Sequence, residues 1–428
     1  MRALIPTANK HSFSGLQWTS FALVVLYLLN CFSPLRLHYD SLRYFAIESC
    51  WQFGCPPNSD AAKDYLPYGY TVLLYILAKL GILKSFALNL INSIYLVLTI
   101  YFVKKICEPG IRRWIYILIV CLNWAIIKYD VSVLSEFQYM FFSIGSLYFF
   151  YQFTRNRNWL TLLIAFLFAA LAFFTRTAGV ALVPALFLGL AWEYRKELIP
   201  RIRKNLIWVL IILILIAGVF VFSRQLGLTH YTRVLSEHAV YTSLAQRFEW
   251  RFREWGELFV NIPIGKVINS TQRFGDTAQA ATILFVGIGM LFFAWIIYAI
   301  FFGKSKLPFV VRAYFFFYSL ILFFWPFNDP RFWVPVVPLV AAAIIQNPFS
   351  NSRVGKLIIK CACAVYLVLG IAAIFYSTYI SFNKEALSKT TSLGNYRNEY
   401  ETHFFGKPLS DTATHTEQWI VDLLNKHD

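Results

Sequence analysis

Charged residues are scarce in this chain of 428 residues. They make up 14% of the sequence, whereas a soluble domain typically carries about 25%. Hydrophobic residues make up 58%, aromatic residues 19%, and the mean hydropathy is +0.56. So few charges would leave a soluble fold of this length with too little polar surface. The composition therefore argues against a soluble enzyme, a nucleic-acid-binding module or a disordered protein.

Several sequence features that define other classes are also absent. No His, Cys and Asp cluster has the spacing of a zinc site, and no repeat of about 20 to 50 residues is present. No Asp or Glu lies in the middle of a long apolar run. Because coupled transporters usually carry ionisable residues near the bilayer midplane, this absence argues against proton or sodium coupling.

Long apolar runs are what the sequence does contain, and they predict an all-α polytopic membrane protein. The first run follows a basic N-terminal segment and lacks a small-residue cleavage site, so we interpret it as an uncleaved helix. We predict about eleven transmembrane helices, at 17–35, 85–103, 114–127, 137–152, 159–173, 178–192, 205–223, 279–302, 313–325, 332–346 and 361–380.

The distribution of positive charge predicts the orientation. With the N-terminus in the cytoplasm, the inner segments comprise 68 residues and hold 19 of the 39 Lys and Arg residues, whereas the outer segments spread the other 20 over 171 residues. The positive-inside rule favours this arrangement. It places the C-terminus outside, and it places 19 of the 22 Asp and Glu residues on the outer side. We expect a membrane domain over 1–380 and an extracytoplasmic tail over 381–428.

The first outer loop, 36–84, begins with Asp40 near the end of the first run. A helix starting there would put Asp40 and Tyr44 on one face, although Asp40 could equally be a helix cap or a solvated carboxylate. A short apolar stretch ending at Gly81 is predicted to lie at the interface as an amphipathic helix. Cys50 and Cys55 would form a disulfide in an oxidising exterior, but need not.

The second long outer loop, 224–278, contains the segment SLAQRFEWRFREWGELFV at 243–260. Its apolar and aromatic residues recur at helical spacing, which predicts an interfacial amphipathic helix. Such a helix could lie on the lipid headgroups or cover a bound substrate.

Three further segments accompany Asp40: DVSVLSEFQY at 130–139, LAFFTRTAGVALVP at 171–184 and DPRFWVPVVP at 329–338. In their order and spacing, these elements resemble the integral-membrane glycosyltransferases of the GT-C fold. The nearest similarity is to the protein O-mannosyltransferases and the lipid A aminoarabinose transferases. The resemblance covers about residues 17–346.

The resemblance implies transfer of a sugar from a polyprenyl-phosphate donor to an acceptor glycan, lipid or protein on the extracytoplasmic face, with Asp40 as the general base. The run Lys63–Pro67 departs from the Glu-Lys-Pro-Pro of the lipid A enzymes, which disfavours lipid A as the acceptor. No Asp-x-Asp motif is present, so neither a divalent metal nor another cofactor is expected. The compact chain favours the bacterial inner (plasma) membrane.

This chemistry requires a carboxylate that takes the acceptor's proton and cations that stabilise the departing phosphate. We predict Asp40 and Glu136 as catalytic, and we expect Asp40, Glu136, Arg176 and Arg331 to line one cavity at the outer membrane boundary. The predicted substrate-binding residues are Tyr44, Arg43, Lys63, Asp64, Tyr65, Asp130, Arg176, Asp329 and Arg331. The alternatives are a transporter or flippase of lipid-linked glycans, a glycan polymerase, or a structural membrane scaffold.

Overall fold

The computed structural model describes a helical protein. It covers residues 15–64, 66–107, 113–195, 233–234, 236–237, 241–271, 277–303, 307–347, 352–409 and 416–428. Over these ranges the chain contains no strand, and an isolated backbone bridge joins Arg36 to Ser132. The predicted all-α class is confirmed.

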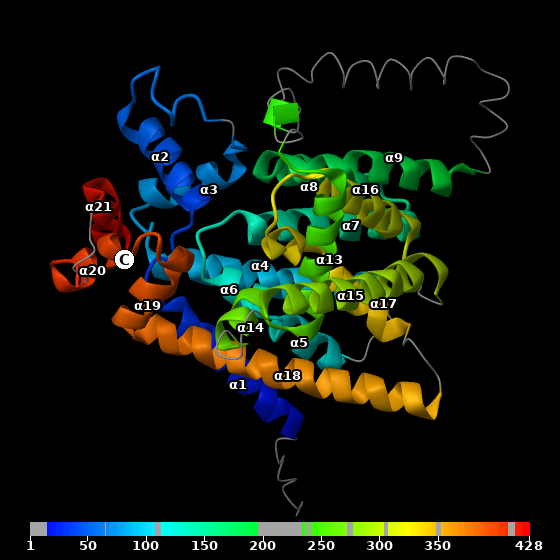
Figure 1. Cartoon of the computed structure of the whole chain (residues 1–428). Helices are drawn as coiled ribbons and strands as arrows, with labels where there is room; N and C mark the ends of the chain where they lie inside the picture. Colours follow the sequence, from blue (N-terminus) through cyan, green and yellow to red (C-terminus); the bar gives the residue numbers. More distant parts are fainter. Residues whose placement is uncertain are drawn as a thin grey trace, which may run out of the picture.

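Three helices in the described ranges are long and apolar enough to cross a membrane: α4 (Ser85–Ile106), α15 (Ala278–Ile297, continued by the π-helical turn η3, Tyr298–Phe302) and α18 (Arg353–Phe382). The helix α18 runs along one edge of the molecule (Figure 1), and only 11% of its most apolar window is buried. An apolar helix that is this exposed needs an apolar solvent. The chain is therefore a membrane protein.

Helices also occupy other predicted runs, but several are shorter than a full span. The run 205–223 lies outside the described residues, and the total of eleven spans stays a prediction. The remaining helices of this group are α1 (Gly15–Cys31), α7 (Glu136–Asn156), α8 (Trp159–Thr175), η1 (Thr177–Ala181) with α9 (Leu182–Glu193), α16 (Phe309–Phe324), and η4 (Pro330–Val336) with α17 (Val337–Gln346).

The prediction of one continuous helix over 114–127 is wrong. The chain instead forms α5 (Arg113–Cys121) and α6 (Trp124–Asp130), with a break at Leu122 and Asn123. The Asn123 side chain accepts bonds from the Ala125 and Ile126 N–H groups of α6. The Asn261 side chain accepts the Trp124 N–H at 2.7 Å and donates to the Leu122 carbonyl at 2.8 Å. These side chains thus provide hydrogen-bond partners for backbone groups that the break in the helix leaves unpaired.

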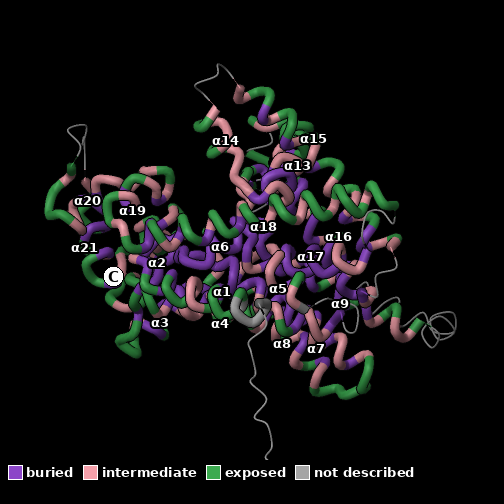
Figure 2. Tube along the Cα trace, turned by 90° about the horizontal axis from the view of Figure 1, so that it is seen from below, coloured by how far each residue is buried: buried purple, intermediate pink, exposed green. Residues whose placement is uncertain are grey.

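The predicted helix over 243–260 is present as α13 (Leu244–Val260), and its interfacial position stays a prediction. It packs against α15, where Gly256 and Gly289 let the two backbones approach closely. Charged side chains on α13 turn inward, and those of Arg251 and Glu254 are 0% and 1% exposed and paired at 3.1 Å. The short helix α14 (Ile264–Thr271) follows. Buried stretches gather around α6 and α17 in the middle of the molecule (Figure 2).

A second core lies at one end of the bundle. Its helices are α2 (Tyr39–Phe53) and α3 (Tyr68–Lys79) from the first loop, and α19 (Lys384–Thr390), η5 (Thr391–Gly394), α20 (Arg397–Phe405) and α21 (Gln418–His427) from the C-terminal segment. Figure 1 shows both groups together at the same end. Their buried residues, including Phe45, Tyr70, Tyr400 and Leu424, form one cluster. The Cys50–Cys55 disulfide is present beside the end of α2.

Candidate active site

Asp40 and Arg331 are the centre of a charged network at this end of the bundle. Arg331 Nη2 lies 2.6 Å from Asp40 Oδ2, although 291 residues separate the two in sequence. Arg331 Nε lies 3.1 Å from Asp329 Oδ2 and 3.6 Å from Glu136 Oε1. One guanidinium therefore joins three carboxylates that come from α2, α7 and the start of η4.

Local structure places each of these groups. Asp40 lies in the first turn of α2 and Glu136 in the first turn of α7, where the helix dipole favours negative charge. Asp329 caps η4 by accepting the Arg331 N–H at 2.9 Å, with Pro330 at the first helical position. Tyr129 of α6 donates its hydroxyl to Asp329 at 2.9 Å. The three carboxylates of the site therefore all lie at the start of a helix.

Arg176 joins the same network from the break between α8 and η1. Its guanidinium forms an ion pair with Glu136, whose side chain is 1% exposed. The guanidinium groups of Arg176 and Arg331 both lie over the Phe332 ring, at 5.5 and 5.1 Å from its centroid. This aromatic contact stabilises two like charges at close range. Asp40, Glu136, Arg176 and Arg331 thus come together, as the sequence predicts.

Arg43 and Asp64 extend the network into the first loop. Arg43 bonds Asp64 with two parallel contacts of 2.8 and 2.7 Å, and its Nη1 lies 3.5 Å from Asp40 Oδ1. Tyr44 is buried and donates its hydroxyl to Ser135 at 3.0 Å, next to Glu136. Arg43, Asp64 and Tyr44 therefore border Asp40 from within the first loop.

The network fixes the ionisation of Asp40. Burial alone would raise the pKa of this carboxyl, but Arg331, Arg176 and Arg43 together hold the pKa below its ordinary value. The Asp40 side chain is nevertheless 24% exposed. Asp40 is therefore an ionised carboxylate that is accessible from outside the network, whereas the Glu136 side chain is enclosed and pairs with Arg176 and Arg331.

Three of the predicted substrate-binding residues are not part of this network. Lys63 is exposed on the loop, and within the described ranges no side-chain contact joins it to Asp40. Tyr65 lies outside the described residues. Asp130 is 1% exposed and accepts a bond from Ser93 of α4 at 2.9 Å. Adjacent residues on a helix point about 100° apart. Asp130 therefore faces α4, whereas its neighbour Tyr129 faces Asp329.

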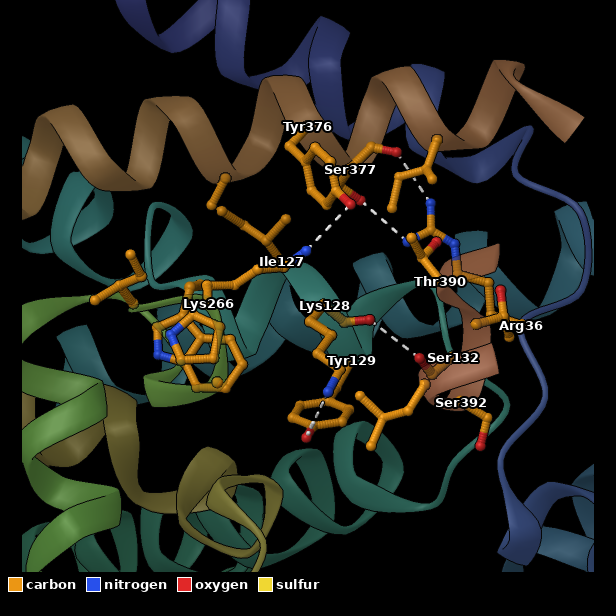
Figure 3. A pocket seen from close by; sticks show the side chains of 18 of the residues that line it. Arg36, Ile127, Lys128, Tyr129, Ser132, Lys266, Tyr376, Ser377, Thr390 and Ser392 are labelled. Atoms are coloured by element: carbon orange, nitrogen blue, oxygen red, sulfur yellow. Dashed lines mark hydrogen bonds between the residues drawn. The ribbon is translucent and has the colours of Figure 1, made fainter. Parts of the chain in front are cut away.

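A cavity of about 820 Å³ borders the network at Asp329. Figure 3 shows its lining, with Lys128 and Tyr129 of α6 on one side and Tyr376 and Ser377 of α18 on the other. Lys266 Nζ approaches the Tyr376 hydroxyl at 3.3 Å. Asp40, Glu136, Arg176 and Arg331 do not line this cavity, so the predicted cavity around these four residues is a different one and stays a prediction.

The cavity has two chemically distinct parts. Leu369, Ala372 and Ala373 of α18 form an apolar wall, whereas Lys128 and Lys389 bring cationic groups. From Leu369 to Ile380 the lining follows α18 for roughly 17 Å at 1.5 Å per residue. Its volume falls within the usual range of ligand sites, about 300 to 1,000 Å³. The shape and polarity suit an amphiphile with an anionic head.

Sequence reasoning did not identify most of the cavity residues. Lys128, Lys266 and Lys389 are isolated cations in three distant segments, and a lone lysine carries no motif. His38 also lines the cavity, and burial, with repulsion from Lys128 and Arg331, lowers the pKa of His38 to about 4. The only available signal is the position of Lys128 and Tyr129, directly after a long apolar run.

Among the described side chains, no group of three or more His, Cys, Asp or Glu residues is arranged to hold a metal ion. The carboxylates of the network are instead paired with arginines. No protein-family model, curated protein or solved structure matches this chain.

Proposed function

We propose that this protein is a glycosyltransferase that moves a sugar from a polyprenyl-phosphate donor to an acceptor hydroxyl on the extracytoplasmic face of the membrane. The observation that carries the proposal is the convergence of Asp40, Glu136, Arg176 and Arg331 from four separate segments into one network. The resemblance to GT-C glycosyltransferases supports the same assignment, and the compact chain favours a bacterial inner membrane.

In the proposed reaction, the bond between the anomeric carbon and the phosphate oxygen breaks, and a bond from the acceptor oxygen to that carbon forms. The acceptor's proton passes to Asp40, and the carrier leaves as its phosphate. A carboxylate with a lowered pKa is a weak base, but it is always ionised. It takes the proton late, because the acceptor oxygen becomes acidic only as its bond to the sugar forms.

The arginines would act on the other side of the reaction. Negative charge grows on the departing phosphate, and fixed guanidinium groups in a partly dry site stabilise it. Glu136 is a positioning residue in this scheme because it is enclosed and holds Arg176 and Arg331 together. The cavity is of suitable size to hold the first part of the carrier's apolar chain. The carrier phosphate would then lie outside its Asp329 end, next to Arg331.

The test uses the purified protein with a panel of polyprenyl-phosphate sugars and measures release of free carrier phosphate. Asp40→Asn should reduce release at least 100-fold while the yield of folded protein is kept. Asp60→Asn, the same change at an exposed position of the same loop, is the matched control and should keep full activity. An Asp40→Asn protein with full activity disproves the base assignment.

A second outcome would select the main alternative. If the protein consumes no donor but moves lipid-linked glycan between the leaflets of proteoliposomes, it is a flippase. A flippase needs no base, so in that case Asp40→Asn and Asp60→Asn should translocate at equal rates.

A further inference from the structure

The described part of the C-terminal tail after α18, residues 383–409 and 416–428, contacts the peptide that leads into α2, the helix that carries Asp40. This peptide, the α1–α2 connection, comprises residues 32–38 and ends two residues before Asp40. The Tyr400 hydroxyl of α20 donates to the Leu35 carbonyl and accepts the Leu37 N–H, the latter at 2.9 Å. The Asp428 carboxylate accepts the Leu35 N–H. Two tail side chains thus bond three backbone groups of the connection, two at Leu35 and one at Leu37.

The opposite side of the connection is held by the segment between α6 and α7. The Val133 N–H donates to the Arg36 carbonyl at 3.4 Å, and the Ser41 hydroxyl donates to the Val133 carbonyl at 2.8 Å. The Arg36 side chain reaches Ser377 and Ser381 of α18, with contacts of 3.4 and 2.8 Å to their hydroxyls. The connection is therefore fixed between the tail and the helix bundle, with its backbone polar groups paired in a buried place.

The tail is anchored at several points around these bonds. Tyr400 is completely buried, and Leu387, Ile420 and Leu424 share the cluster of α2 and α3. The His427 ring stacks on Phe45 of α2 at 5.2 Å between centroids. His403 bonds the second carboxylate oxygen of Asp428 at 2.9 Å and so fixes its orientation. The tail therefore packs as an integral layer against the helix that carries Asp40.

From this arrangement we infer that the tail is a strap that positions Asp40 against Arg331, with Tyr400 and Asp428 as its two positioning residues. Its effect on sugar transfer rests on the proposed function, whereas its effect on the position of Asp40 does not. A strap of this kind transmits any movement of the tail to the start of α2, because Leu37 is only three residues from Asp40.

The test measures backbone hydrogen exchange and the coupling between Asp40 and Arg331 in the full-length protein in nanodiscs. Tyr400→Phe keeps the ring and removes both bonds, so the Leu37 amide should exchange about 30-fold faster. The coupling free energy between Asp40 and Arg331, from a double-mutant cycle, should fall by at least half in this background. Tyr241→Phe, the same change on an exposed tyrosine before α13, should leave both quantities unchanged.

Asp428→Ala is a second variant, which should release the Leu35 amide and the His403 contact but keep both Tyr400 bonds to the connection. Unchanged exchange in both Tyr400→Phe and Asp428→Ala would overturn the strap. Faster exchange with an unchanged coupling would overturn its positioning role. If carrier release is established, kcat should fall in Tyr400→Phe and the KM for the donor should stay constant. Absence of carrier release from the wild-type protein refutes the proposed function but leaves the exchange and coupling results decisive for the strap.

Discussion

The Asp40–Arg331 ion pair permits the most direct test of the site, because its contribution to stability can be measured without knowing the substrate. Two unit charges 2.6 Å apart attract by about 6 kcal/mol at an effective dielectric constant near 20. Desolvation of both groups offsets much of this attraction. The side chains are 24% and 15% exposed, so solvent also screens part of it. A charged hydrogen bond of this kind contributes about 2 kcal/mol net.

The experiment is a double-mutant cycle with Asp40→Asn, Arg331→Gln and the double variant, each unfolded reversibly in mixed micelles. We expect a coupling free energy of about 2 kcal/mol. Arg331→Gln should destabilise more than Asp40→Asn, because it also leaves Asp329 and Glu136 without this guanidinium. A cycle between Asp60→Asn and Arg331→Gln provides the control and should show no coupling. A coupling between Asp40 and Arg331 below about 0.5 kcal/mol would refute the network as described.

Four further predictions concern the surrounding structure. Arg176→Leu removes the partner of Glu136, whose side chain is 1% exposed, and should lower the free energy of unfolding by about 3 kcal/mol, measured in the same micelles. Gly289→Ala should destabilise by about 3 kcal/mol, because its Cβ would lie 1.7 Å from the Phe252 carbonyl oxygen; Gly287→Ala, with nothing within 4 Å, should not destabilise. Cys50→Ser opens the five-residue disulfide loop and should cost about 2 kcal/mol; an equal loss in the reduced wild-type protein checks this, and a stable Cys50→Ser contradicts it. Burial lowers the pKa of His403, but Asp428 and Asn425 more than compensate and raise it overall above 6.5, with Lys384 opposing them. The stabilisation from the His403–Asp428 pair should therefore be complete below about pH 6.5 and be lost as the pH rises through the His403 pKa. Amide exchange at Leu35, corrected for its intrinsic rate, should show this change in the wild type and lack it in His403→Gln.

The charged residues of the site were predictable individually because each lies where an apolar run ends. Asp40, Glu136, Arg176, Asp329 and Arg331 all flank apolar helices, and a charged group at such a boundary stays near water or pairs with an opposite charge. Their mutual contacts were not determined by local pattern. Asp40 and Arg331 are 291 residues apart, and only the packing of α2, α7, η1 and η4 brings them together.

The cavity and the strap could not be predicted by the same reasoning. Lys128, Lys266 and Lys389 have no common spacing, and Tyr400 lies in a tail without a recognisable motif. Their roles depend on which helices lie beside one another, which hydrophobic periodicity does not specify. The same limit explains Asp130, which carries the residue type of a site but faces α4 and accepts a bond from Ser93.

By itself, the sequence determined that the protein is helical and resides in a membrane. That result follows from composition and run length, because a backbone in lipid must satisfy its hydrogen bonds within each helix. Tertiary structure decided where helices break, as at Asn123, and which faces are buried, as for Arg251 and Glu254 of α13. It also decided that the tail holds the connection before Asp40. These features depend on contacts between distant segments, whose energies no local pattern contains.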